Sequence, residues 1–189
     1  LYGPDVGLWG GEPRFYECLF ENEFVPTIEH LESMVDKDTV AILYNFPSNP
    51  TGATITAQQR DELLAFAQKH DLWIITDEVY DRIVFDSEHV SFVGCDDERV
   101  ILINSFSKTY AMTGWRIGYI LSANKEAMAQ MIKIQYYITA CSNDAMQYAV
   151  LEAINEADHY PDEMCAEFKA RRDLICSRLN SMPGVQCHV

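Results

Sequence analysis

The sequence has few basic residues, with 14 Lys and Arg against 29 Asp and Glu and a net charge of −15. Nucleic acids and anionic membrane surfaces attract clustered positive charge, so this balance argues against both as partners. No stretch approaches the roughly 20 apolar residues that a membrane-spanning helix needs. The first residues contain neither a Met nor a basic signal-peptide start, which favours a cytoplasmic protein whose sequence begins within a longer chain.

Paired metal-ligand motifs are also missing. The six cysteines include no CxxC pair and no zinc-ligand spacing, so no metal site is expected. Without a secretory signal, we expect these thiols to stay reduced. The five histidines are dispersed and lie mostly in charged segments, which favours surface or helix-cap roles.

The remaining composition, with 48% hydrophobic residues over 189 positions, is enough for one domain with a core. Short β-branched runs alternate with segments of helical periodicity, which indicates right-handed crossovers and a mostly parallel sheet. The fold class expected is α/β, a three-layer sandwich followed by helices. We expect strands at 14–20, 40–44, 72–76, 100–103 and 116–121, and helices at 28–35, 56–70, 123–140, 144–156 and 161–181.

Polar residues follow three of the expected strands, at 45–52, 77–81 and 104–109. Ligands of open α/β sheets bind beyond the carboxyl ends of the strands, so these segments are candidates for one cleft. Each segment taken alone also suits a turn, a helix cap or an ordinary loop. Their occurrence together, in this order, favours a shared functional site.

Three of these stretches resemble the class I/II aminotransferases, which are fold-type-I pyridoxal-phosphate (PLP) enzymes. They are Asn-Pro-Thr-Gly at 49–52, Asp-Glu-Val-Tyr at 77–80 and the highly specific Ser-Phe-Ser-Lys-Thr-Tyr-Ala-Met-Thr-Gly-Trp-Arg-Ile-Gly-Tyr at 105–119. The resemblance covers essentially the whole chain. It implies that residues 1–189 are the PLP-binding large domain, truncated at both ends.

The same resemblance implies that two further parts of the site lie outside this chain. The glycine-rich phosphate loop would precede Leu1, and the arginine that binds the substrate carboxylate would lie in a small domain after Val189. We therefore expect little or no transaminase activity from the isolated 189 residues.

The resemblance assigns the reactive groups of the cofactor site. Lys108 matches the catalytic lysine that forms a Schiff base with PLP and then acts as general base and acid. Asp77 matches the carboxylate that pairs with the protonated pyridine nitrogen, which keeps the ring able to accept electrons. Tyr80 and Asn49 match the two partners of the phenolic oxygen of the cofactor, and Asn49 also matches a contact of the substrate carboxylate.

The phosphate-binding positions of the family match Ser105, Ser107 and Arg116. Arginine suits that task because its planar fork of donors fits phosphate oxygens. A constrained Asn-Pro bond beside a site is a place where a cis peptide is expected, here at Asn49–Pro50. Glu78 follows Asp77 directly, but adjacent side chains point in different directions, so no shared role is expected.

The activity implied is transfer of an amino group between an amino acid of aspartate, alanine or aromatic type and a 2-oxo acid, in a homodimer. One alternative is another enzyme of the same fold, a carbon–sulfur β-lyase or a cyclopropane-carboxylate synthase, which would share Asn49, Asp77, Tyr80, Lys108 and Arg116. A second is the aminotransferase-like sensor domain of a bacterial transcription regulator, which would carry a basic winged-helix reader ahead of the domain. The stretch 111–115 favours the enzyme.

Overall fold

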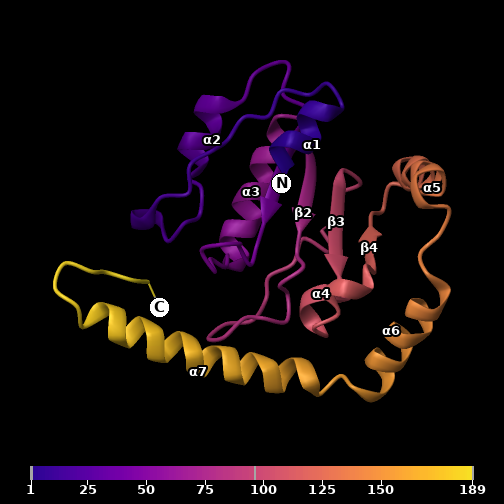
Figure 1. Ribbon diagram of the computed structural model, residues 1–189. Helices are drawn as coiled ribbons and strands as arrows, with labels where there is room; N and C mark the ends of the chain where they lie inside the picture. Colours follow the sequence, from indigo (N-terminus) through magenta and orange to yellow (C-terminus); the bar gives the residue numbers. More distant parts are fainter. Residues whose placement is uncertain (1, 96, 189) are drawn as a thin grey trace.

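Four strands form the sheet at the centre of the computed structural model, which describes residues 2–95 and 97–188 (Figure 1). In order across the sheet they are β1 (Ala41–Asn45), β2 (Trp73–Asp77), β3 (Val100–Ser105) and β4 (Gly118–Leu121). The first three are parallel, and β4 pairs antiparallel with β3. The mostly parallel sheet expected from the sequence is confirmed.

The five expected helices are all present, with ends within two residues of the expected ones. Two short helices, α1 and α4, were not expected from the sequence. The described helices are α1 (Tyr2–Leu8), α2 (Ile28–Met34), α3 (Ala57–Lys69), α4 (Phe106–Thr109), α5 (Lys125–Thr139), α6 (Asp144–Glu156) and α7 (Tyr160–Asn180), with 3₁₀ turns η1 (Phe20–Asn22) and η2 (Thr113–Trp115).

Side-chain caps define where α2 and α3 begin. The Thr27 hydroxyl accepts the His30 backbone N–H at 3.2 Å. Thr56 and Gln59 form a reciprocal capping box, in which each side chain accepts the backbone N–H of the other at 3.2 and 2.8 Å. These contacts satisfy helix N–H groups that have no intrahelical partner.

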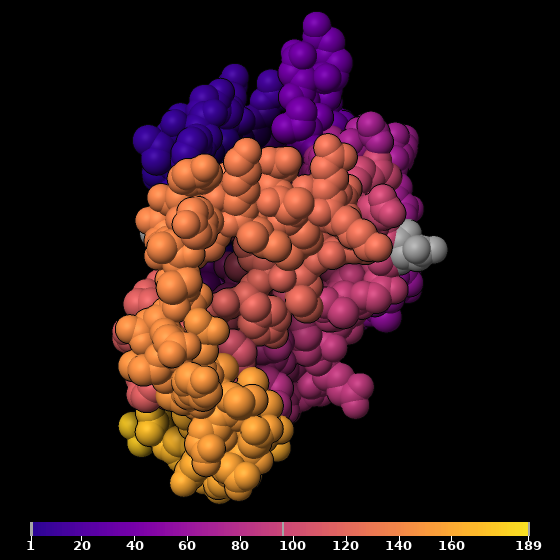
Figure 2. Space-filling view, turned by 90° about the vertical axis from the view of Figure 1, so that its right-hand side faces the viewer, coloured from indigo at the N-terminus to yellow at the C-terminus, as the bar shows by residue number. Residues whose placement is uncertain are grey.

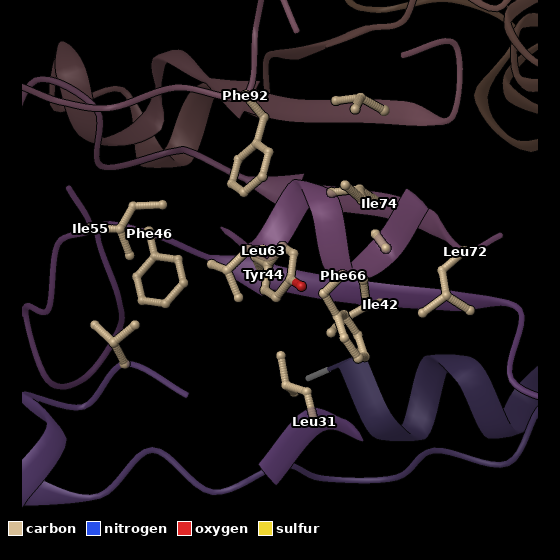
Figure 3. Packing of buried hydrophobic residues seen from close by; sticks show 13 residues of the cluster. Leu31, Ile42, Tyr44, Phe46, Ile55, Leu63, Phe66, Leu72, Ile74 and Phe92 are labelled. Atoms are coloured by element: carbon tan, nitrogen blue, oxygen red, sulfur yellow. The ribbon is translucent and has the colours of Figure 1, made fainter. Parts of the chain in front are cut away.

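The core lies between α3 and one face of the sheet (Figure 3). Tyr44 of β1 is fully buried, and its ring stacks on that of Phe92 with centroids 5.6 Å apart. Leu63 and Phe66 of α3 are also buried in this cluster. Its buried members are Val25, Leu31, Ile42, Tyr44, Phe46, Ile55, Leu63, Phe66, Ala67, Leu72, Ile74, Phe92 and Val100.

The strand expected at 14–20 is wrong. Residues 14–19 form neither helix nor strand and Phe20 begins η1, because hydrogen bonds of this segment go to side chains and single carbonyls and not to a partner strand. The Glu17 N–H donates to His30 Nε2 at 3.0 Å, and the Tyr16 hydroxyl donates to the Leu43 carbonyl at 2.8 Å. The alternating polarity of this segment therefore does not correspond to pairing with a neighbouring strand, although Tyr16 packs against the core cluster.

Helices α5, α6 and α7 form a helical arm that runs around the sheet, seen as the orange-to-yellow band in Figures 1 and 2. The arm buries few side chains, with none in α5, Val150 and Ala153 in α6, and Pro161 and Cys176 in α7. Among the described residues, no helix is long and apolar enough to span a membrane.

Candidate active site

The register of the parallel strands brings the polar loop segments to one edge of the sheet. Asn45 is opposite Asp77 at the carboxyl ends of β1 and β2. The Asn45 side chain donates to the Asp77 carbonyl at 3.1 Å and accepts the Asn49 N–H at 2.9 Å. Asn45 therefore fixes the loop after β1 against β2. In the sequence, only the position of Asn45 as the first polar residue after an expected strand indicated that it holds this loop.

Three of the predicted site residues lie close together at this edge. Each comes from the segment that follows one of the three parallel strands. The Asn49 amide donates to the Tyr80 hydroxyl at 3.1 Å. Lys108 Nζ, near the end of α4, lies 5.5 Å from the centre of the Tyr80 ring. The Asn49–Pro50 peptide bond is cis, as expected.

The Asp77 carboxylate lies at the same edge and already has two donors. The Val79 N–H donates to Oδ1 at 3.2 Å, and the Tyr2 hydroxyl donates to Oδ2. Burial raises the pKa of Tyr2, with the neighbouring carboxylate adding to the shift, so this phenol stays protonated as a donor. An ionised carboxylate has about four acceptor positions, so Asp77 can take a further donor. Nothing in the local sequence around Tyr2 indicated this contact.

The two serines and Arg116 are connected through Thr113. Ser105 Oγ accepts the Ser107 N–H at 3.3 Å as the cap of α4. The Thr113 hydroxyl donates to the Ser107 carbonyl at 3.0 Å, and the Arg116 guanidinium donates to the Thr113 carbonyl at 2.9 Å. The guanidinium is held in this corner by a backbone carbonyl, and within residues 2–95 and 97–188 its other donors make no hydrogen bond, so they can bind an anion.

Gly118 allows this corner to form. A Cβ at Gly118 would lie 2.7 Å from the Asn104 carbonyl oxygen and 3.0 Å from the Ser105 Cβ. Only glycine therefore permits β4 to pair with β3 opposite Ser105. The pairing sets the position of Arg116, two residues earlier.

Glu78 points away from the site, as expected for the neighbour of Asp77. It is buried, and it accepts hydrogen bonds from His89 Nε2 at 2.7 Å, the Phe92 N–H at 3.0 Å and the Thr76 hydroxyl at 3.0 Å. The surface or cap role expected for His89 is wrong, because its ring is largely buried against this carboxylate. Burial by itself would raise the pKa of Glu78, but the bonds from His89 and Phe92 outweigh it and lower that pKa.

Asp81 fixes α4, the helix that carries Lys108, through two hydrogen bonds. Its carboxylate accepts the Asn104 amide at 2.8 Å and the Thr109 hydroxyl at 3.3 Å, and both of these donors are buried. Thr109 directly follows Lys108, so Asp81 links the turn that carries Tyr80 to the helix that carries Lys108. A cavity of about 150 Å³ lies beside this support.

Not every predicted residue is in direct contact with the others. Among residues 2–95 and 97–188, no hydrogen bond or ion pair joins Lys108 to Asp77, or Arg116 to either serine. The arrangement thus presents an amine, a carboxylate, a phenol and an amide around one edge, with a guanidinium nearby. Such a set can hold a planar, anionic molecule with both donors and acceptors.

The fold and the site geometry define the class of the protein. It is an α/β protein with a polar site at the carboxyl edge of its sheet. The structure superposes on the aromatic aminotransferase of Pyrococcus horikoshii OT3 with a TM-score of 0.92 and 38% sequence identity, covering 96% of this chain and 50% of that one. The fold is therefore the α/β sandwich of the fold-type-I aminotransferases.

Comparison of sequences identifies the family. The sequence model for aminotransferase class I and II matches residues 1–188, and the chain belongs to that family. It is 40% identical to aromatic-amino-acid aminotransferase 2 of Thermococcus litoralis and 37% identical to aspartate aminotransferase of Thermotoga maritima. Each alignment covers 96% of this chain and 48% of the relative, so the chain spans about half the length of these curated relatives.

Proposed function

We propose that the full-length protein is a PLP-dependent aminotransferase that moves an amino group between an amino acid and a 2-oxo acid. The observation that carries the proposal is the meeting of Asn49, Tyr80 and Lys108 at the carboxyl edge of the sheet. Membership of the class I and II family supports the same activity.

The residues at the edge have the donors and acceptors that PLP requires. In the proposal, Asn49 and Tyr80 donate to its phenolic oxygen, Asp77 accepts from its pyridine nitrogen, and Ser105, Ser107 and Arg116 bind its phosphate. When bound, PLP supplies a carbonyl that takes up the amino group and a ring that accepts electrons from the substrate's Cα–H bond. The residue types are chemically matched to each of these groups.

The residues of this chain would hold and move one proton. Lys108 binds the cofactor and then carries the proton to and from the substrate Cα, a task suited to an amine on a flexible stem. Asn49 also orients the substrate carboxylate. The Asp77 carboxylate is held in place by the bond from the Val79 N–H.

Other parts of the proposal rest on the sequence and the family resemblance. Residues 1–189 would be the PLP-binding portion of the large domain, and the enzyme would act as a cytoplasmic homodimer. The exposed apolar side chains of β4, Tyr119, Ile120 and Leu121, are compatible with a surface that is covered in the assembled enzyme.

The experiment is a panel of amino donors with a 2-oxo acid acceptor, run on the full-length protein. It includes aspartate, alanine, tyrosine and phenylalanine, because relatives are named for aromatic and aspartate substrates. Pyruvate and sulfide release from a cysteine conjugate is measured in parallel, since that outcome would indicate the carbon–sulfur lyase instead.

Lys108→Ala is expected to reduce transfer by at least about 10³-fold, because it removes both the covalent anchor and the proton carrier. The matched control is Lys133→Ala, which removes an exposed lysine from α5. Loss of activity in the control, or full transfer by Lys108→Ala, would contradict the assignment.

A further inference from the structure

Two thiols lie in contact far from the cofactor site. Cys176 is in the last turns of α7, and Cys187 is 11 positions later in the segment that follows the helix. Their Sγ atoms are 3.5 Å apart. A disulfide needs roughly 2.05 Å between sulfurs, so the two Sγ atoms must move closer together for the bond to form.

The backbone around Cys187 is held beside the helix. The Asn180 side chain accepts the Cys187 N–H at 2.7 Å and donates to the Cys187 carbonyl at 3.0 Å. The next residue, His188, bonds the Phe20 carbonyl at 2.9 Å and packs on the Phe20 ring at 4.0 Å between centroids. The two sulfurs therefore face each other because the segment is anchored on both sides of Cys187.

The two thiols differ in access. Cys176 is buried and 5% exposed, whereas Cys187 is partly exposed. Burial raises the pKa of the Cys176 thiol, and its contact with Cys187 adds to the shift. An incoming disulfide therefore reaches Cys187 first, and Cys176 acts second, from inside.

The pairing is specific to these two residues. Within the part of the chain that the structure describes, no other pair of cysteines is recorded in sulfur–sulfur contact. Cys165, on the same helix, instead donates to the Val84 carbonyl at 3.2 Å. The sequence spacing gave no sign of the pair, because it depends on the chain turning back after α7.

We propose that Cys176 and Cys187 form a reversible intramolecular disulfide by exchange with a small-molecule disulfide such as glutathione disulfide. The Cys187 thiolate attacks one sulfur of the small disulfide, forming a mixed disulfide and releasing one small thiol. Cys176 then attacks the Cys187 sulfur and releases the second small thiol. Two protein thiols are oxidised and one small disulfide is reduced to two thiols. The bond ties the segment after α7 to that helix.

The test uses the reduced full-length protein equilibrated with glutathione disulfide and then digested with trypsin without reduction. Cleavage at Arg178 separates the two cysteines, so the disulfide appears as a linked pair of peptides, one spanning 173–178. We expect this pair, a fall of two free thiols per chain, and full reversal by dithiothreitol.

Variants distinguish the order of the two steps. Cys176→Ser is expected to hold a mixed disulfide at Cys187, whereas Cys187→Ser leaves Cys176 unmodified. Cys141→Ser, which removes an exposed thiol, should form the linked pair as the natural protein does. The proposal is overturned if Cys141 becomes modified in the natural protein while the peptides of Cys176 and Cys187 stay separate. It is also overturned if Cys176 and Cys187 are linked only between two chains. Because the linked peptide is detected in the natural sequence, a variant that fails to fold does not remove the test.

Discussion

Two neighbouring carboxylates have opposite environments at the residue scale. Asp77 faces the candidate site, whereas Glu78 is buried and bonded to His89 and to the Phe92 N–H. Since folding lowers the pKa of Glu78, the folded chain favours the ionised carboxylate. The unfolded chain therefore takes up the proton first as pH falls. The stabilisation is present above the unfolded value of about 4.3 and is lost as pH falls below it.

Glu78→Gln is expected to lower the free energy of unfolding at pH 7 by about 1–3 kcal/mol, because a buried charge-assisted bond is lost. Gln does not titrate, so the gap from the natural chain should narrow as pH is lowered from about 6 to about 3. Thermal unfolding followed across this range measures both effects. Glu152→Gln, an exposed substitution on α6, serves as the control and should change neither. A gap that widens in acid would contradict the account.

At the scale of elements, the position of α4 depends on the elements around it. This helix has only four residues, too few to be stable alone, so its position depends on tertiary contacts. Asp81 supplies two of them, to Asn104 and Thr109. The helix therefore presents Lys108 in one place because the Asp81 carboxylate, from the turn after β2, fixes the neighbouring Thr109.

Asp81→Ala should leave the buried Asn104 amide and Thr109 hydroxyl without their acceptor. We expect a loss of about 2 kcal/mol in the free energy of unfolding and roughly tenfold weaker binding of PLP to the full-length protein. Denaturant unfolding and a PLP absorbance titration measure the two quantities. Asp38→Ala, at an exposed loop carboxylate, is the matched control. Unchanged PLP affinity in the Asp81 variant would show that α4 is positioned by other contacts.

The elements also show what the sequence could predict. Thr27 and the box of Thr56 and Gln59 were predictable, because a cap involves residues three positions apart. The segment 14–20 was mispredicted as a strand, because an alternation of polar and apolar residues does not show whether a partner strand is available. The contact between Tyr2 and Asp77 spans 75 positions and depends on how separate elements pack, so no local pattern could reveal it. Strand ends located the candidate site because the carboxyl ends of parallel strands share an edge.

In the whole molecule, α3 and α7 are attached to the rest of the chain by different kinds of contact. The sheet and α3 are joined by a buried apolar cluster, whereas ion pairs join α7 to the segment 82–86, beside the hydrogen bond from Cys165 to the Val84 carbonyl. Arg82 pairs with Asp158 and Asp162, at 3.2 and 3.0 Å, and Asp86 pairs with Arg172 at 2.6 Å. Partly exposed pairs of this kind each contribute about 0–1 kcal/mol and weaken as salt screens them. These ion pairs are thus expected to hold α7 less firmly than the buried cluster holds α3.

Salt should therefore loosen α7 before it affects α3. In 1 M NaCl we expect amide hydrogen exchange in α7 of the 189-residue chain to rise about fivefold, which corresponds to about 1 kcal/mol, with little change in α3. Arg82→Ala should raise exchange in α7 at low salt and reduce its dependence on salt. Arg171→Ala is the control, because its partner Glu167 lies on α7 itself and the pair does not attach the helix to the sheet. Exchange in α7 that responds to salt as little as exchange in α3 would mean that buried apolar contacts hold both helices. The charged contacts along 82–86 would then contribute little to the attachment of α7.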